Sequence, residues 1–435
     1  MKLYSTNNKS LQVPFKEAVF NSLPVDKGLY MPEVIPALDE EFIQNLPQLS
    51  LQEIALKVAG NLIGNSIPPS DLKGIIDDAI NFDAPLVPLK DGTSVLELFH
   101  GPSLAFKDFG ARFMSRIMGY FSAKEDRVLD ILVATSGDTG GAVALGFLGV
   151  PNTRVTILYP KGKVSEIQEL QLCTNAQNIR ALEIDGTFDD CQALVKQAFN
   201  DSEVNGKLRL TSANSINIAR LIPQSFYYFH AYGQAIKEGH TEVVFSVPSG
   251  NFGNIGAGLL AYKMGLPVKQ FLAATNANDV VPRYLESGEY DPRPSLQTIS
   301  NAMDVGNPSN WVRVLDLFNQ DDNALKNILT AYSFSDEQTR EAIEEIDKAN
   351  DYIACPHTAI AWLASKSYKN EDKGDYASVF LSTAHPCKFP SVYSEELTSK
   401  ISIPEQVTAM AGREQSKISL DKTYDSFKGF LLENL

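Results

Sequence analysis

Two glycine-rich segments, each directly after a short apolar run, constrain the fold of this 435-residue chain more than any other feature. The first is Ala134–Gly141, ATSGDTGG, and the second is Ser249–Gly256, SGNFGNIG. Small and apolar residues in a helical pattern follow both. A strand, a glycine loop and a helix in this order are typical of a parallel sheet covered by helices, in which ligands bind beyond the carboxyl ends of the strands. The sequence therefore predicts an α/β fold with its chemistry at these two loops.

The pattern changes along the chain. Residues 11–81 are mostly helical in pattern, whereas short β-rich runs, glycine loops and helical patterns alternate from about Thr93 onward. We expect no more than surface helix and tail in the last thirty residues. The predicted units are a helical N-terminal unit (1–92), a large α/β domain (93–125 and 205–435) and a smaller α/β domain (126–204). The clearest strand candidates are Leu129–Ala134, Arg154–Leu158, Leu208–Thr211, Val243–Val247, Gln270–Ala274 and Ser378–Leu381.

The charge of the chain excludes some classes of partner. A formal net charge of −15 at pH 7 repels nucleic acid and anionic membranes, so any anionic ligand needs a local site. The polar start, Met1–Asn8, and the lack of a long apolar run predict a soluble cytoplasmic protein that does not bind membranes. Four cysteines without a C-x-x-C pair and five scattered histidines predict reduced thiols and no metal site.

The loop at 249–256 has the character of a phosphate cradle. Its glycines let backbone amides approach phosphate oxygens, and the N-terminus of the following helix adds partial positive charge. The loop lacks the Lys-Ser/Thr ending of a Walker A motif, and its glycine spacing does not match that of a dinucleotide-binding loop. Taken alone, a tight turn that only joins strand to helix explains the loop equally well.

The loop at 134–141 is a second candidate anion site. The hydroxyls of Ser136 and Thr139, together with loop amides, suit a substrate carboxylate or phosphate. Asp138 would repel such a group unless it accepts a hydrogen bond from a hydroxyl or a protonated group. A simpler interpretation is that Ser136 or Asp138 caps the helix, and capping is compatible with binding.

Lys107, at the start of a helical pattern that runs to Met118, is the third candidate. An isolated lysine is usually a surface residue. Its apolar neighbours would nevertheless lower the pKa of the ammonium, and a neutral lysine is what imine formation with an aldehyde requires. A lysine and two anion loops together predict a Schiff-base cofactor site. We interpret His100 as structural and Cys387, although it lies near His385, as a packing residue.

Four motifs then indicate a family. The run Leu98–Asp108, LFHGPSLAFKD, closely resembles the cofactor-lysine signature of threonine synthases, and TSGDTGGA, PSGNFGN and STAHPCKFP resemble further motifs of that family in the same order. The N-terminal segments MKLYSTNN and VPFKEAVFNSLPVDKGLYMPEVIP resemble its longer bacterial and fungal-type members. The resemblance covers essentially the whole chain. It implies the tryptophan-synthase-β-like fold, which is fold type II of pyridoxal-phosphate (PLP) enzymes.

The resemblance also implies roles for individual residues. Lys107 would carry pyridoxal 5'-phosphate, and the hydroxyl of Thr383 would face the pyridine nitrogen. Asp138 stands where distant members of the fold carry asparagine, which leaves its contact with the cofactor ring open. The cofactor phosphate would be received by Gly250, Asn251, Phe252, Gly253 and Asn254. The substrate carboxylate would be faced by Ser136, Gly137 and Thr139.

The implied reaction is that of a carbon–oxygen lyase acting on phosphates: O-phospho-L-homoserine and water give L-threonine and phosphate in threonine biosynthesis. We expect the substrate phosphate to lie at Asn214, Ser215 and Arg220, with Lys161 and Lys163 as weaker candidates. The alternative for Arg220 is a structural ion pair in a capped helix. A dehydratase, a related phospholyase and a non-catalytic binding module remain alternative functions. We expect a monomer or a homodimer.

Overall fold

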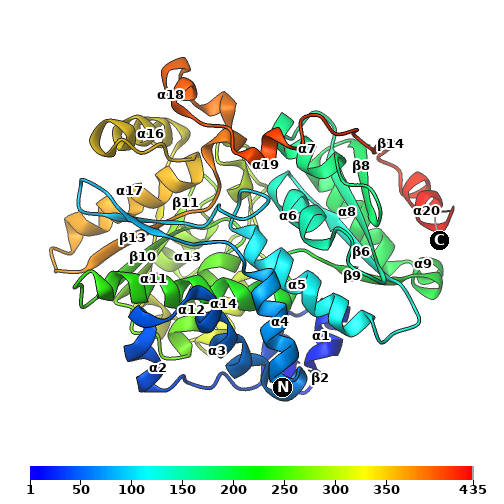
Figure 1. The fold of residues 1–435 in the computed structure, drawn as a ribbon, viewed down its shortest axis with the longest axis horizontal. Helices are drawn as coiled ribbons and strands as arrows, with labels where there is room; N and C mark the ends of the chain where they lie inside the picture. Colours follow the sequence, from blue (N-terminus) through cyan, green and yellow to red (C-terminus); the bar gives the residue numbers. More distant parts are fainter. Residues whose placement is uncertain (434–435) are drawn as a thin grey trace.

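Two mainly parallel sheets make up the core of the computed structural model, in which residues 1–433 are described (Figure 1). The six-stranded sheet has the order β12-β11-β10-β13-β5-β4, and only β4 runs antiparallel to its neighbour. Its strands are β4 (Leu86–Pro88), β5 (Ser94–Glu97), β10 (Val243–Pro248), β11 (Gln270–Thr275), β12 (Leu329–Ser333) and β13 (Ala377–Ser382).

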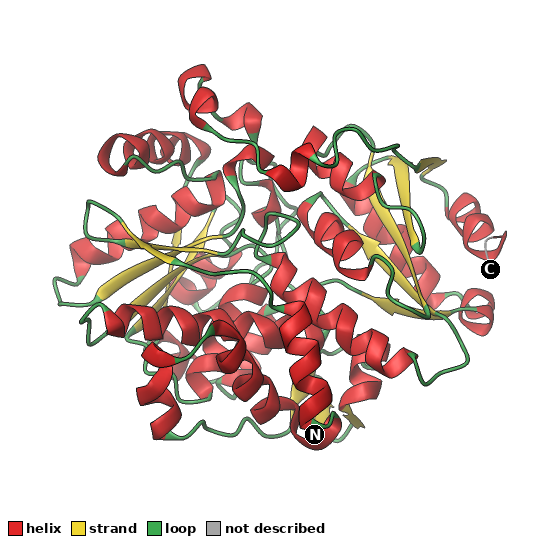
Figure 2. Ribbon diagram, in the orientation of Figure 1, coloured by secondary structure: helices red, strands yellow, loops and turns green. Residues whose placement is uncertain are grey.

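The second sheet is five-stranded and wholly parallel, with the order β14-β8-β7-β6-β9. Its strands are β6 (Leu129–Ala134), β7 (Thr153–Pro160), β8 (Ile179–Asp185), β9 (Arg209–Ser212) and β14 (Lys417–Asp421). The two sheets lie on opposite sides of a central group of helices, as Figure 2 shows. The α/β class and the parallel-rich sheets predicted from the sequence are confirmed.

Helices cover both faces of each sheet, because alternate residues of the central strands are buried in different apolar clusters. On the six-stranded sheet, α11 and α12 lie on one face and α16 and α17 on the other. On the five-stranded sheet, α6 and α7 lie opposite α8 and α20. These helices are α6 (Asp138–Phe147), α7 (Glu166–Cys173), α8 (Phe188–Asn200), α11 (Phe226–Lys237), α12 (Gly253–Lys263), α16 (Asp336–Asn350), α17 (Pro356–Glu371) and α20 (Tyr424–Glu433).

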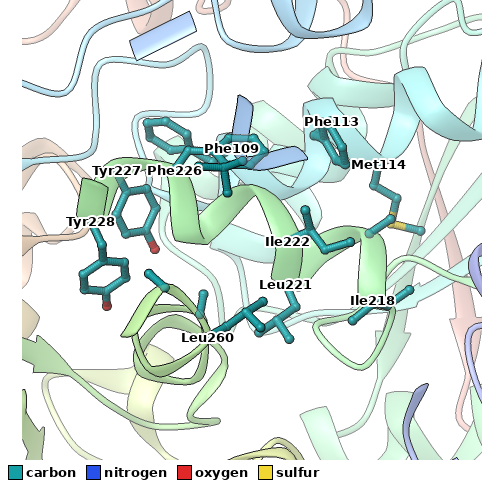
Figure 3. Packing of buried hydrophobic residues seen from close by; sticks show 14 of the residues in the cluster. Phe109, Phe113, Met114, Ile218, Leu221, Ile222, Phe226, Tyr227, Tyr228 and Leu260 are labelled. Carbon is teal, nitrogen blue, oxygen red and sulfur yellow. The ribbon is translucent and has the colours of Figure 1, made fainter. Parts of the chain in front are cut away.

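Helix α5 (Lys107–Ser122) lies between the two sheets and is held by aromatic packing (Figures 1 and 3). Phe109 and Tyr227 meet edge to face with ring centroids 5.1 Å apart, and Phe113 and Phe226 do so at 5.8 Å. Such pairs contribute about 0.5–1.5 kcal/mol each beyond their buried area. The helix that begins at Lys107 is therefore a rigid support.

The N-terminal unit packs beneath this central group and carries its predicted helices α1 (Phe15–Asn21), α2 (Glu40–Asn45), α3 (Leu51–Ile63) and α4 (Pro69–Ala79). It also contains an antiparallel sheet, β2-β1-β3, which the helical pattern did not predict. Its strands of three or four residues are too short to show a period. They are β1 (Lys2–Ser5), β2 (Gln12–Pro14) and β3 (Tyr30–Pro32).

All six predicted strands are present, but two strands join a different sheet from the one the predicted ranges suggest. β9 and β14 come from the range 205–435, yet both pair in the five-stranded sheet. The expectation of only helix and tail near the C-terminus was wrong, since β14 pairs with β8 there. A strand pattern does not identify its pairing partner, and β14 is largely exposed, so it shows no apolar run. The boundaries of the units remain a prediction.

The remaining α-helices are short and connect the longer elements. They are α9 (Ser202–Lys207), α10 (Ile218–Leu221), α13 (Val280–Ser287), α14 (Trp311–Leu317), α15 (Asp322–Lys326), α18 (Glu395–Lys400) and α19 (Glu405–Thr408). Within residues 1–433, no helix combines the length and the apolar character needed to span a bilayer.

Candidate active site

Lys107 opens α5 beside the segment that follows β13. Phe106 donates its backbone N–H to the carbonyl of Thr383 (2.9 Å), and Ala105 and Ala384 form an antiparallel bridge. Lys107 and Thr383, predicted from separate motifs, are thus held on adjacent backbone. The Lys107 side chain is 16% exposed. Burial lowers the pKa of its amine to about 8, although the Asp138 carboxylate opposes the shift. About a tenth of the amine is therefore neutral at pH 7, far more than for an ordinary lysine.

The loop between β10 and α12 presents a helix N-terminus and a buried side-chain amide. Phe252 adopts a left-handed conformation (φ 59°) immediately before α12 begins at Gly253. The Asn254 side-chain oxygen accepts hydrogen bonds from the hydroxyls of Tyr227 (2.6 Å) and Tyr228 (2.7 Å). Its Nδ2 is buried and has no hydrogen-bond partner within the described residues. The helix N-terminus and this amide offer donors to an anion.

The loop between β6 and α6 is organised by Thr135, which the sequence analysis did not single out. The Thr135 hydroxyl oxygen accepts from the backbone N–H groups of Gly137 (3.0 Å) and Gly140 (2.9 Å). Capping by Ser136 or Asp138 was a wrong expectation, because Gly137 is the N-cap residue and the free N–H of Gly140 in the first turn of α6 is satisfied by Thr135 instead. Gly137 has φ 137°, and a Cβ there would lie 2.4 Å from the Gln168 side chain. The loop thus packs tightly against α7.

Asp138 forms a buried ion pair that the sequence analysis missed. Its Oδ1 is 2.8 Å from Nζ of Lys388 and accepts from Nε2 of Gln168 (3.0 Å), while its Oδ2 lies 4.0 Å from Nζ of Lys107. Burial raises the pKa of Asp138, but Lys388 and Lys107 outweigh burial and hold it well below its ordinary value. Lys388 belongs to the motif STAHPCKFP. Lys388 could have been predicted from the sequence by noting that Asp138, if buried, needs a cation nearby.

The segment 211–220 brings a guanidinium to the same place. Arg220 is 3% exposed, donates to the carbonyl of Ala213 (2.7 Å), and has an Nε without a hydrogen-bond partner among residues 1–433. It lies so close to α5 that a Cβ at Gly110 would come within 2.7 Å of this Nε. The Arg220 charge contributes to lowering the pKa of Lys107. Within the described chain Arg220 forms no ion pair, so the structural ion pair considered from the sequence is wrong.

The neighbouring Asn214 and Ser215 connect this segment to both glycine loops. Asn214 donates from Nδ2 to the carbonyl of Ala134 (3.3 Å), and the Ser215 hydroxyl oxygen accepts from Nδ2 of Asn251 (2.6 Å). Arg313 is fully buried and donates to the carbonyls of Ser215 (3.2 Å) and Ile216 (2.7 Å). Asn217, rather than a residue proposed for binding, caps α10.

The other candidates have structural surroundings. Lys161 is 59% exposed and lies 3.9 Å from Glu183, a partner outside the cluster around Lys107. His100 lies 2.8 Å from Glu97. Burial lowers the pKa of His385 to about 4 and raises that of Cys387 to about 11, so Cys387 is a poor nucleophile. No cluster of three potential metal-ligating side chains occurs between residues 1 and 433.

Comparison with known proteins adds the family. Residues 84–384 match the family described as pyridoxal-phosphate dependent enzyme, and residues 2–80 and 358–431 match the threonine synthase N-terminal and C-terminal families. A threonine synthase from Haemophilus influenzae is 44% identical over 434 residues, which cover 100% of both chains. The chain belongs to the threonine synthase family.

Solved structures of threonine synthases agree with this membership. The crystal structure of threonine synthase from Escherichia coli matches with a TM-score of 0.91 and 41% identity, covering 100% of both chains. PLP-bound threonine synthase from Brucella melitensis matches with a TM-score of 0.91 and 35% identity, covering 100% of this chain and 99% of the other. The family enzyme uses pyridoxal 5'-phosphate, and the predicted cofactor is confirmed.

The residues of this chain suit that cofactor. A buried lysine with a lowered pKa is matched to its aldehyde, and the unpartnered Asn254 amide at the N-terminus of α12 is matched to its phosphate. Thr383 and the 250–254 loop follow the neighbouring strands β13 and β10 of the six-stranded sheet, and the backbone hydrogen bond from Phe106 to Thr383 brings Lys107 to the same edge.

Proposed function

We propose that this protein converts O-phospho-L-homoserine and water to L-threonine and phosphate, with pyridoxal phosphate attached to Lys107. The observation that carries the proposal is the buried Lys107 amine, which lies beside Asp138 of one glycine loop. The residue before it, Phe106, is hydrogen-bonded through its backbone to Thr383. The similarity of the whole chain to a threonine synthase supports the choice of product.

In the proposed reaction, the chain's own residues move protons and orient the substrate. Lys107 takes protons from Cα and Cβ, phosphate leaves from Cγ, a proton is returned to Cγ, water adds at Cβ, and a proton is returned to Cα. Bound pyridoxal phosphate supplies an electron sink for the charge that develops on the substrate. Thr383 faces the cofactor nitrogen, and Gly250, Asn251, Phe252, Gly253 and Asn254 hold the cofactor phosphate.

Two groups of residues hold the substrate in this proposal. Loop amides and hydroxyls at Ser136, Gly137 and Thr139 receive the carboxylate, with Asp138 neutralised by Lys388 and so not repelling it. The Arg220 guanidinium, with its unpartnered Nε, receives the substrate phosphate together with Asn214 and Ser215. The protein acts in the cytoplasm as a monomer or homodimer on this small molecule, and its net charge of −15 disfavours nucleic acid.

The test compares substrates. Purified protein is supplied with pyridoxal phosphate, and release of phosphate and formation of threonine are measured with O-phosphohomoserine, O-phosphothreonine and serine. Threonine and phosphate in equal amounts from O-phosphohomoserine alone support the proposal. Turnover of serine alone would make the protein a dehydratase, and turnover of O-phosphothreonine alone would make it a phospholyase.

A second measurement tests the lysine. The visible absorption of bound cofactor should disappear on borohydride reduction, and reduction should attach the cofactor to the peptide that contains Lys107. Lys107→Ala should lower kcat by at least about 10³-fold, because it removes both the attachment and the acid–base group. Protein that stays colourless with added pyridoxal phosphate would contradict the proposal and favour a non-catalytic binding module.

A further inference from the structure

The ion pair between Asp138 and Lys388 crosses from one sheet to the other. Asp138 opens α6 at the end of β6 in the five-stranded sheet. Lys388 ends a short 3-10 helix (Pro386–Lys388) that follows β13 of the six-stranded sheet. Lys388 is 0% exposed, and few lysines are fully buried without a specific partner. The pair therefore ties the predicted substrate loop to the Thr383 segment.

Lys388 is already committed to protein partners. Besides Asp138, its ammonium donates to the carbonyl of Ser103 (2.8 Å), which also accepts from Nε2 of Gln171 (2.9 Å). The backbone N–H of Ser103 in turn donates to the buried Asp108 carboxylate (2.8 Å). Lys388 thus contacts both the substrate loop and the segment that leads into Lys107. A fully buried ammonium with these contacts is placed to organise the site rather than to bind substrate itself.

We propose that Lys388 is a positioning residue that holds the Asp138 carboxylate as a fixed anion beside Lys107, so that the substrate loop and the cofactor lysine are set by one buried ion pair. The proposal rests on the proposed role of Lys107 as the cofactor lysine. It explains how an aspartate can occupy a loop that is expected to receive an anion: Asp138 is neutralised from the opposite sheet.

Removal of Lys388 should change the protonation of Lys107. Asp138 raises the pKa of Lys107, whereas Lys388 lowers it. Without Lys388, the Asp138 carboxylate would pair with Lys107 alone and make its ammonium harder to deprotonate. The titratable or charged groups that face this pair and Lys388 are His357 on α17, Cys355 at its N-cap, Arg220 on α10, Asp108 on α5, and His385 and Cys387 after β13.

The experiment measures cofactor capture by the apoprotein, which does not require turnover. The rate of pyridoxal phosphate attachment is followed by absorbance across pH, because only the neutral amine attacks the aldehyde. Lys388→Met should move the midpoint upward by about one pH unit, so that capture at pH 7 slows about tenfold. Lys388→Arg keeps the charge and should stay close to the wild type. Lys400→Met, which removes an exposed pair with Asp347, is the matched control.

An unchanged midpoint in folded Lys388→Met protein would overturn the proposal, because a purely structural lysine would affect stability without moving the Lys107 titration. If Lys388→Met does not fold, Asp138→Asn decides, since it should move the midpoint downward by removing the group that raises the pKa of Lys107. A midpoint that does not move, or that moves upward, in Asp138→Asn would equally overturn the proposal.

The same data separate this proposal from the proposed function. If wild-type protein captures the cofactor through Lys107 and forms threonine, but the midpoint is insensitive to Lys388, only the role of Lys388 fails. If Lys107→Ala captures the cofactor as fast as wild-type protein, the cofactor lysine itself is wrongly assigned, and the proposed function fails with it.

Discussion

The two glycine loops follow strands of different sheets and differ in the charge of the groups that hold them. Around Asn254, the loop after β10 is held by neutral groups, the hydroxyls of Tyr227 and Tyr228. The loop after β6 carries a buried carboxylate, Asp138, which is compensated by Lys388 and approached by Lys107. Neutral donors around a helix N-terminus suit a phosphate that stays bound. The Asp138 carboxylate makes the other loop sensitive to the charges of the side chains beside it, Lys388 and Lys107.

The largest effect is expected when a carboxylate is placed in the loop that is held by neutral groups. Asn254→Asp places an oxygen where an unpartnered buried amide now points, and this oxygen would repel the cofactor phosphate. Like charges placed side by side cost several kcal/mol, and a loss of about 4 kcal/mol of binding free energy corresponds to roughly a 10³-fold loss of cofactor affinity. Titration of apoprotein with pyridoxal phosphate measures the loss. The exposed Asn319→Asp is the control, and equal affinities in the two variants would contradict the neutral character of the loop.

The buried ammonium of Lys107 should lower the free energy of unfolding of the apoprotein. Burial lowers the pKa of Lys107 from 10.5 to about 8, so the unfolded chain binds more protons between these pH values and the free energy of unfolding rises with pH there. Below pH 8 the penalty is up to about 3 kcal/mol. Lys107→Met apoprotein should therefore be more stable than wild-type apoprotein at pH 7, with the difference vanishing by pH 10.5.

Urea unfolding of both apoproteins at pH 7, 8, 9 and 10 measures this difference. Lys366→Met, which removes an exposed lysine paired with Glu345, is the control and should show no such pH dependence. A Lys107→Met apoprotein less stable than wild type at pH 7 would mean that the ion-paired loop depends on Lys107 as well as on Lys388.

Arg220 should affect the substrate far more than the cofactor, on which its stated effect is to help lower the pKa of Lys107. Arg220→Gln removes the guanidinium with the unpartnered Nε, and loss of a charged hydrogen bond to the substrate phosphate costs about 2 kcal/mol. KM for O-phosphohomoserine should rise about 30-fold, with a much smaller change in cofactor affinity. Arg340→Gln, on exposed α16, is the control. A fall in cofactor affinity alone would move Arg220 to the cofactor side of the site.

The smallest expected effect concerns the support of the charged loop. Ser165 caps α7 in a capping box with Gln168, whose Nε2 donates to Asp138. Ser335 caps α16 in the same motif far from the site. Ser165→Ala and Ser335→Ala should each reduce stability by about 1 kcal/mol in thermal or urea unfolding. Only Ser165→Ala should also raise KM, and identical kinetics in both variants would argue against a role of Gln168 in bracing the loop.

The sequence located the parts of the candidate site that depend on local pattern. Strand ends, glycine loops and the start of a helical pattern are local features, and Lys107 and both loops were predicted from them, whereas Thr383 was predicted only from the resemblance to threonine synthases. Lys388 was not predicted, since a lysine in a loop is usually exposed and its burial depends on Asp138 from the other sheet. Thr135 was missed for a similar reason, because its hydroxyl serves two amides within a loop whose conformation the sequence does not reveal.

The fold shows the same division between local and distant information. The six predicted strands are short β-rich runs that are present in the structure, whereas the predicted ranges assigned β9 and β14 by chain position rather than by pairing. Parallel sheets join strands that are distant in sequence, so their membership is settled by packing over the whole chain.

The position of β14 has a consequence for synthesis of the protein. β14 completes one edge of the five-stranded sheet by pairing with β8, and the strands β9 to β13, which include four strands of the six-stranded sheet, lie between them in the chain. During translation, β8 therefore leaves the ribosome with an unpaired edge and keeps it until nearly all of the polypeptide has been made. The nascent chain thus exposes an unpaired strand edge, which can pair with other chains, while residues between β8 and β14 are being translated. We expect chaperones to bind the nascent chain mainly during this stage.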